Sequence, residues 1–184
     1  MGLEEEIKQC TKCPLSKTRK NAVPGTGNKK AKIMFIGEAP GFNEDLKGVP
    51  FIGRAGEVFD ELLSCVGLSR EKIFITNIVK CRPPGNRDPT PQEIKACTPF
   101  LDKQIQEINP KIIVPLGRFA TEYIMKKYGL KTEKISVAHG KKFSVQTLLG
   151  KITIIPMYHP AVATYDASKK GVLLKDFKSV LPLL

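Results

Sequence analysis

The sequence has no tryptophan, only two histidines and far fewer acidic than basic side chains. Eighteen Asp and Glu residues oppose thirty Lys and Arg residues, so the formal net charge is +12. Such an excess favours a polyanionic partner, either a nucleic acid or a membrane surface. The alternative is a Lys-rich surface of the kind that stabilises some thermophile proteins. The two histidines leave few candidates for proton chemistry near neutral pH.

A long hydrophobic run is also missing from the N-terminal region, which reads MGLEEEIKQC. This acidic, amphipathic stretch is too short of apolar residues for a signal peptide or a membrane span. Its Met-Gly start lacks the Ser or Thr of a myristoylation signal, because the sixth residue is Glu6. We therefore expect a cytoplasmic protein that does not bind a membrane. Five cysteines in a reducing compartment are not expected to form a disulfide framework.

What the chain does contain is an alternation of strand and helix patterns over 184 residues with 41% apolar content. This excludes disorder and predicts one domain, residues 1–184, with an N-terminal segment at 1–30 followed by the sheet. Strands are predicted at 32–37, 72–79 and 111–117, and in the second arm of a hairpin around Gly150. Helices are predicted at 3–9, 55–68, 91–108, 118–128 and 168–181. A Lys-, Gly- and Pro-rich link is expected at 17–30.

One helix start has a clear signature. Thr90 has the properties of an N-cap, Pro91 occupies the first helical position, and Glu93 completes a capping box. The alternation as a whole predicts an α/β fold, a parallel sheet with helices on both faces. In such folds ligands bind beyond the carboxyl ends of the strands. Those ends, at 37–41, 77–82, 116–117 and 157–161, carry most of the polar and glycine-rich segments.

Four of the five cysteines fall into two groups. Cys10 and Cys13 form a C-x-x-C, Cys81 follows the second strand, and Cys97 lies in the next helix. Four thiolates suit either zinc or an iron–sulfur cluster, and the wide separation of the two groups favours a cluster over a zinc ribbon. The alternative for each cysteine is a small buried hydrophobic residue, which is our interpretation of Cys65.

Four motifs follow successive strands in order: GEAPG, VPFIGRAG, TNIVKCRPPGNRDPTPQEI and YHPA. In this set the sequence resembles the family 4 uracil-DNA glycosylases, the thermostable iron–sulfur branch of their superfamily, over nearly the whole chain. The resemblance implies a three-layer α/β/α sandwich with a four-stranded parallel sheet. It also implies a [4Fe–4S] cluster on Cys10, Cys13, Cys81 and Cys97, and excision of uracil from DNA by a monofunctional enzyme in base excision repair.

The residues that match the motifs suit this reaction, in which uracil leaves as an anion from an oxocarbenium-like sugar. An amide at Asn77 can donate to uracil O4 and accept from N3–H, a pattern that cytosine reverses. His159 can donate to uracil O2. The resemblance implies that Phe51 stacks on the flipped base and that the backbone of Ala39 contacts it. It further implies that Glu44 lies beside uracil C5, where bulk excludes the methyl group of thymine.

The resemblance thus implies that the acidic residues that follow the strand at 32–37 face a transient sugar cation. Glu38 matches the catalytic acid of the family and can orient the attacking water or stabilise the cation by its charge. The better-known branch of the superfamily has an Asp one residue later, where this chain has Ala39, so both roles for Glu38 stay open. Asp45 is expected to be an N-cap or a solvated charge, and His139 to be structural or to face phosphate.

Uracil-containing DNA, single- or double-stranded, is the expected partner, and we expect a monomer with a sliding-clamp contact left open. Phosphate contacts are expected from Arg82, Arg87, Lys141, Lys142, Lys169 and Lys170. Val162 and Tyr165 are the two candidates for filling the gap that a flipped base leaves. Two alternative functions are a non-catalytic, metal-stapled nucleic-acid-binding module and an iron–sulfur electron carrier. The loop CRPPGNRDPTP has no histidine for covalent capture of DNA, so turnover is expected.

Overall fold

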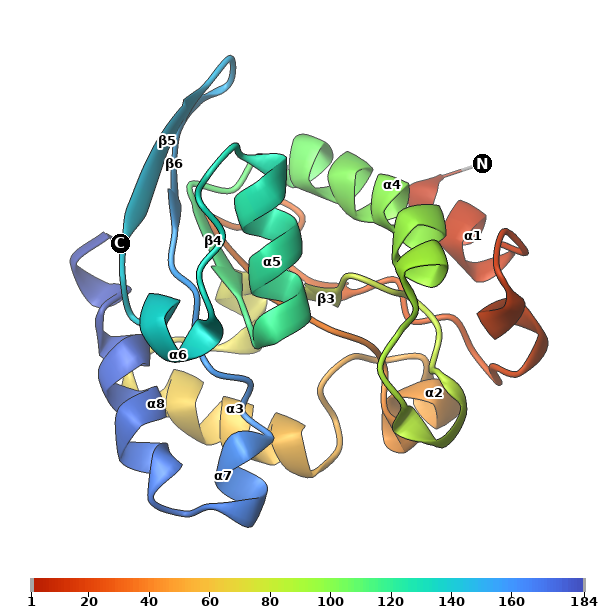
Figure 1. Cartoon of the computed structure of the whole chain (residues 1–184), viewed down its shortest axis with the longest axis horizontal. Helices are drawn as coiled ribbons and strands as arrows, with labels where there is room; N and C mark the ends of the chain where they lie inside the picture. Colours follow the sequence, from red (N-terminus) through yellow and green to blue (C-terminus); the bar gives the residue numbers. More distant parts are fainter. Residues whose placement is uncertain (1, 184) are drawn as a thin grey trace.

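Figure 1 shows the computed structural model of the chain, which describes residues 2–183. Helices and strands alternate along most of its length, as the sequence predicts. The α-helices are α1 (Leu3–Lys8), α2 (Phe42–Lys47), α3 (Arg54–Cys65), α4 (Pro91–Ile108), α5 (Arg118–Lys127), α6 (Ile135–Ala138), α7 (Val162–Tyr165) and α8 (Lys169–Lys178). The strands are β1 (Thr26–Gly27), β2 (Ile33–Gly37), β3 (Ile73–Asn77), β4 (Ile112–Pro115), β5 (Phe143–Thr147) and β6 (Gly150–Ile154). Short 3-10 helices are η1 (Pro14–Lys17), η2 (Arg70–Lys72), η3 (Pro84–Asn86) and η4 (Leu181–Leu183).

The sheet has six strands in the order β1-β3-β2-β4-β6-β5, which corrects the predicted four-stranded parallel sheet. Its four central strands, β3, β2, β4 and β6, are mutually parallel, as expected. The two edge strands are antiparallel to their neighbours. One of them, β5, is the first arm of the predicted hairpin around Gly150. The other, β1, is only two residues long and lies within the link predicted at 17–30.

Helices cover both faces of the sheet, so the three-layer α/β/α architecture is confirmed. On one face Phe35 of β2 packs against Phe59 of α3 and Phe177 of α8, with ring centroids 5.0 and 5.6 Å away. On the other face Met34 and Ile36 of β2 join Leu101 of α4 and residues of α5 in a second core cluster. Strand β2 is buried on both faces because it lies in the middle of this sandwich, which explains its continuous apolar run.

The N-terminal segment packs against α4 and forms a third, smaller core. Ile7 of α1, Leu15 of η1 and Phe100 of α4 are almost fully buried there. Val23, in the link, is completely buried, and its backbone N–H donates to the carbonyl of Lys80 at 2.7 Å. The link is therefore part of the packed structure. The predicted capping box of α4 is confirmed, since Thr90 Oγ1 accepts from the Glu93 N–H and Glu93 Oε2 accepts from the Thr90 N–H.

Helix α2 was not predicted, and it changes the interpretation of the acidic residues behind β2. Asp45, expected to be an N-cap or a solvated charge, lies inside α2 and is only 4% exposed. Its Oδ1 accepts from the backbone N–H groups of Lys20 and Asn21 at 2.9 and 3.3 Å. This carboxylate joins α2 to the N-terminal segment. None of the helices within residues 2–183 is long and apolar enough to cross a membrane.

Candidate functional site

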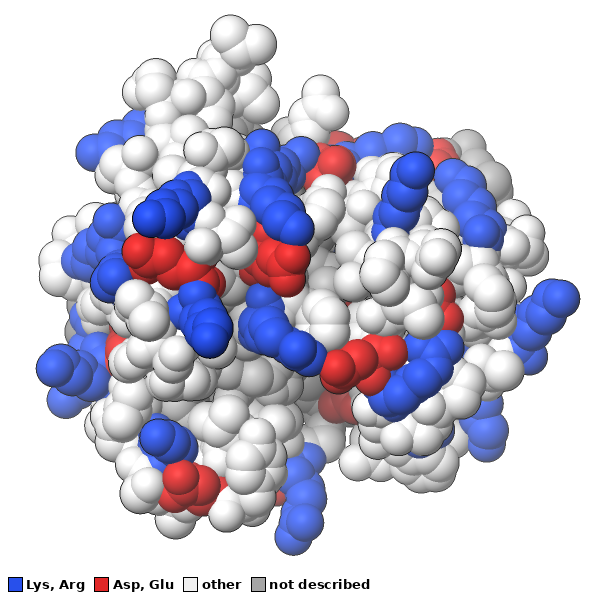
Figure 2. Space-filling model, viewed as in Figure 1, with Lys and Arg blue, Asp and Glu red and all other residues white. Residues whose placement is uncertain are grey.

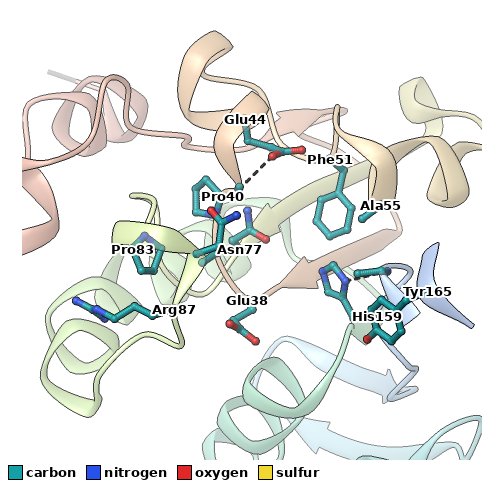
Figure 3. Close-up of a pocket in the computed structure, with 14 residues that line it drawn as sticks. Glu38, Pro40, Glu44, Phe51, Ala55, Asn77, Pro83, Arg87, His159 and Tyr165 are labelled. Carbon is teal, nitrogen blue, oxygen red and sulfur yellow. Dashed lines mark hydrogen bonds between the residues drawn. The ribbon is translucent and has the colours of Figure 1, made fainter. Parts of the chain in front are cut away.

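A pocket of about 540 Å³ opens at the carboxyl ends of the parallel strands, where the sequence places its motifs. This volume is in the range of small-molecule sites. All six residues predicted to catalyse or to bind the base line it: Glu38, Ala39, Glu44, Phe51, Asn77 and His159. They come from four parts of the chain, namely the segment after β2 together with α2, the loop before α3, the end of β3 and the segment after β6, and all but Ala39 are labelled in Figure 3. The parallel strands bring them together, because neighbouring parallel strands end on the same edge of the sheet.

Asn77 is the last residue of β3 and is only 1% exposed. Its Oδ1 has no hydrogen-bond partner among the described residues. A buried amide oxygen without a partner costs free energy, so its presence at the pocket is explained by a bound ligand that supplies the donor. Gly37 faces this amide from β2, and a Cβ there would lie 2.4 Å from Asn77 Oδ1 and 2.7 Å from the Phe51 ring. A glycine at this position therefore keeps the space around the amide open.

Phe51 and His159 are neighbours in the lining of the pocket. Their ring centroids are 5.4 Å apart and their planes differ by 27° (Figure 3). Phe51 adopts a positive φ of 54°, which is uncommon for a bulky side chain. The loop around it is held by Glu44, whose Oε1 accepts from the N–H groups of Ile52 and Gly53, both at 2.8 Å. The other Glu44 oxygen accepts from the Gly41 N–H, which is the dashed line in Figure 3.

The protonation state of His159 follows from its surroundings. The backbone N–H of Ala161 donates to His159 Nδ1 at 3.2 Å, so in the neutral ring the proton is on Nε2. Burial lowers the pKa of His159 to about 4, against the opposing effect of the Glu44 carboxylate. At neutral pH the side chain is an uncharged imidazole that can donate one hydrogen bond from Nε2.

Glu38 directly follows β2, and its pKa moves the other way. Burial raises the pKa to about 7, the Asp88 carboxylate adds to the rise, and the Arg118 guanidinium opposes it. Asp88 and Arg118 themselves form an ion pair of 2.8 Å between the loop after η3 and the start of α5. A carboxylate with such a pKa can accept a proton efficiently near neutral pH. The sequence pattern contained no signal for this ion pair.

Several further residues line the pocket that sequence reasoning did not single out as base contacts: Pro40, Gly41, Ala55, Pro83, Asn86 and Ala161. Asn86 also has a positive φ, 56°, and its Oδ1 accepts from Arg82 Nε at 2.7 Å. Its position in the proline-rich loop next to Cys81 is the only sequence signal for it. Of the two candidates for the gap-filling residue, Tyr165 lines the pocket and is 77% exposed, whereas Val162 packs against the core.

The four cysteines of the two predicted groups meet. Cys10, Cys13, Cys81 and Cys97 line one small cavity between the N-terminal segment and α4, together with apolar side chains such as Ile7 and Phe100. Nitrogen donors surround the sulfur atoms. Cys81 Sγ accepts from Arg19 Nη1 at 3.1 Å, and Cys97 Sγ accepts from the Lys80 N–H at 3.2 Å. Cys65, in contrast, is exposed on α3, so its interpretation as a buried hydrophobic residue was wrong.

The arrangement of these thiols bears on the kind of metal group that fits. The described residues contain no set of three or more His, Cys, Asp or Glu side chains that could hold a metal ion. The four cysteines nevertheless line one cavity. Zinc needs its thiolates about 2.3 Å from a single centre. A polynuclear cluster bonds each thiolate to a different iron atom, so the donor set fits a cluster better.

On the face shown in Figure 2 the basic side chains are spread out, and several lie next to an acidic side chain. Three of the predicted phosphate contacts form ion pairs: Arg87 with Glu93 at 2.7 Å, Lys141 with Glu133 at 2.9 Å, and Lys170 with Glu61. His139 pairs with the buried Asp176 at 2.8 Å, which supports the structural alternative of the two expected for it. Some of the predicted phosphate contacts are therefore already paired with an acid of the chain.

A family model and several known proteins match most of this sequence. The model of the uracil DNA glycosylase superfamily matches residues 24–181. A type-4 uracil-DNA glycosylase of Saccharolobus solfataricus is 52% identical over 97% of this chain and 83% of its own length. Proteins of the same description from Sulfurisphaera tokodaii and Archaeoglobus fulgidus are 48% and 47% identical, over 98% and 95% of this chain and 83% and 88% of their own lengths.

Proposed function

The chain belongs to the uracil DNA glycosylase superfamily, and within it to the type-4 branch, and from this premise we propose how it excises uracil from DNA. The enzyme is a monofunctional hydrolase of the N-glycosidic bond that leaves an abasic site. The single observation that carries the proposal is the buried, unpartnered Oδ1 of Asn77 in the pocket. A flipped uracil supplies the missing partner, because its N3–H donates to this oxygen while the Asn77 amide N–H donates to uracil O4.

The remaining pocket residues hold the base in place. The base stacks on the ring of Phe51, whose loop is braced by Glu44. Glu44 also closes the side of the pocket at which thymine would carry its methyl group. Cytosine is rejected because its N4 donor and N3 acceptor oppose those of the Asn77 amide, and leaving buried polar groups unpaired can cost a large factor in rate.

In the chemical step the bond between sugar C1′ and uracil N1 breaks, and its electron pair leaves with uracil. Neutral His159 donates from Nε2 to uracil O2, where negative charge gathers. Water adds to C1′ and gives up a proton to the Glu38 carboxylate. The products are an abasic sugar and the uracil anion, which takes up one proton while Glu38 releases the proton it received from water. We expect the protein to act as a monomer in the cytoplasm on single- or double-stranded DNA, and a sliding-clamp contact stays a prediction.

The test is base release from matched oligonucleotides that carry one uracil, thymine or cytosine, followed by alkali to cut abasic sites. We expect cleavage at uracil alone, with large losses in the Glu38→Gln and His159→Ala proteins. Asn77→Asp should disturb the choice of base and spare the affinity for DNA without uracil. An iron-replete, folded protein that binds DNA and releases no base would instead be a binding module.

A [4Fe–4S] cluster held by Cys10, Cys13, Cys81 and Cys97 is part of the proposal. When bound, it supplies a covalent brace between the N-terminal segment, the proline-rich loop and α4, with no part in the hydrolysis. Burial raises the pKa of the Cys97 thiol to about 11, so its thiolate needs a bound metal to form readily at neutral pH.

Metal analysis of protein purified without oxygen tests this assignment. We expect about four iron atoms per chain and a brown colour, both lost in the Cys97→Ala protein. The Cys65→Ala protein is the matched control and should keep its iron, because Cys65 lies on α3 outside the cavity. Stoichiometric zinc in place of iron would overturn the cluster assignment.

A further inference from the structure

The segment 50–53, here called the Phe51 loop, lies in the connection between α2 and α3 and carries an aromatic ring that lines the pocket. Its backbone is unusual, because Phe51 has a φ of 54° and α3 passes very close to it. A Cβ on Gly56 of α3 would lie 1.9 Å from the Phe51 carbonyl oxygen. A bulky residue does not adopt this conformation unless its surroundings hold it there. Hydrogen bonds with two side chains hold the loop in this conformation.

Arg70, in η2 before β3, contacts the loop from outside the pocket. Its Nη1 donates to the carbonyl of Pro50 at 3.1 Å, and its Nη2 donates to the carbonyl of Phe51. The guanidinium is itself oriented by Asp60 of α3, which accepts from Nε at 2.7 Å and from Nη2 at 3.2 Å. Arginine suits this position because its planar fork can serve a carboxylate and two carbonyls at once.

The loop is thus held from both ends. Arg70 binds the carbonyl groups of Pro50 and Phe51, and Glu44 binds the N–H groups of Ile52 and Gly53. Between these two contacts the Phe51 ring lies beside His159, and its centroid is 5.2 Å from that of Phe59. The Arg70 side chain is 24% exposed and does not line the pocket. Its direct contact with the base-binding residues is therefore the pair of hydrogen bonds to the loop.

We propose that Arg70 is a positioning residue for uracil excision, which holds the Phe51 ring as a preformed stacking surface for the flipped base. The inference rests on the proposed function, since it assigns Phe51 the stacking role described above. Without Arg70 the two carbonyls lose their donors, and Phe51 can relax to a negative φ that turns the ring away from its place beside His159. A displaced contact of this kind slows an enzyme by up to about 100-fold.

A double-mutant cycle of Arg70→Met and Phe51→Ala tests the proposal. The measured quantity is the single-turnover rate of uracil release with saturating enzyme. We expect each single change to lower the rate about 10- to 100-fold, and the double variant to be no slower than Phe51→Ala alone. Lys72→Met is the matched control. Lys72 is exposed and lies two positions after Arg70, so the change removes one positive charge of the same short helix. Its rate should equal that of the wild type.

The outcomes separate this inference from the function. Losses that multiply in the double variant, or an Arg70→Met protein as fast as the wild type, overturn the role of Arg70 while uracil excision stands. A wild-type protein that releases no uracil overturns both. If Arg70→Met does not fold, as judged by circular dichroism and iron content, the cycle is run with Arg70→Lys. This variant keeps the charge and loses the fork, so the same non-additive result is expected.

Discussion

Burial in one pocket moves the pKa values of two side chains in opposite directions. It raises the pKa of Glu38 to about 7 and lowers that of His159 to about 4, because a low-dielectric site disfavours the charged form of either group. At neutral pH the site therefore holds a neutral hydrogen-bond donor and a carboxylate that can still accept a proton. Leaving-group stabilisation and water activation need this pair of states at the same time.

The rate of uracil release should rise with pH through about 7, because only the ionised form of Glu38 accepts a proton from water. His159 stays neutral above about pH 4 and should add no inflection in this range. Single-turnover rates between about pH 5 and pH 9 would measure the profile. In Glu38→Gln the rate should fall about 10²- to 10⁴-fold and lose the inflection. An inflection that persists in this variant would assign it to another group.

Tyr165 is the residue that we expect to fill the gap left by the flipped base. It lines the pocket and is 77% exposed. Only a base-paired helix has a gap to fill, so Tyr165→Ala should slow uracil release from double-stranded DNA more than from single-stranded DNA. The same oligonucleotide with and without its complement measures this difference. Equal losses on both substrates would contradict the assignment.

At the scale of elements, the start of α4 ties the proline-rich loop to the helix that carries Cys97. Glu93 accepts a hydrogen bond from the Thr90 N–H and two from the Arg87 guanidinium, at 2.9 and 2.7 Å. The hydrogen bond from Arg87 is the main reason that the pKa of Glu93 falls to about 2. The loop that borders the base pocket is thereby anchored to the first turn of α4.

Because of this anchor, the free energy of unfolding should decrease at low pH. The pKa of Glu93 is lower in the folded than in the unfolded chain, so its contribution is complete above about pH 4.5 and is lost as the pH falls toward about 2. Urea unfolding at a series of pH values measures this. Between about pH 4.5 and pH 2 the free energy of unfolding should fall less in Glu93→Gln than in the wild type. Thr90→Ala is the comparison: it loses a cap worth about 1 kcal/mol, but it keeps the Arg87 hydrogen bonds that are the main cause of the low pKa of Glu93, so most of the pH dependence should remain. Parallel pH curves for Glu93→Gln and wild type would contradict the prediction.

At the scale of the whole molecule, a net charge of +12 favours binding to DNA, although several surface cations are paired with acids. Affinity for DNA without uracil should fall steeply with salt, as phosphate contacts release counterions. The Lys169→Met change, at the start of α8, should reduce the slope of log affinity against log salt concentration by about one. Lys8→Met on α1, distant from α8 in Figure 1, should leave the slope unchanged. A smaller slope in both variants would mean that total charge, not this face, binds DNA.

Much of the site could be predicted from the sequence because its determinants are local. Continuous apolar runs specify β2, β3 and β4, and the order Thr90, Pro91, Glu93 specifies the start of α4. Neighbouring parallel strands end at the same edge of the sheet, so this part of the prediction does not require the packing of side chains to be known. For the same reason the motifs of Glu38, Asn77 and His159 could be expected to meet before the structure was known.

Other features depend on contacts between segments that are distant in the sequence, and only the tertiary structure decided them. Asp45 is buried because the N-terminal segment supplies its donors, and the two-residue strand β1 exists only through its pairing with β3. Arg70 lies in none of the sequence motifs, yet its guanidinium donates a hydrogen bond to the carbonyl of Phe51, nineteen positions earlier in the chain. Periodicity and motifs report the preferences of neighbouring residues, whereas side-chain contacts of this kind form only when the whole chain has packed.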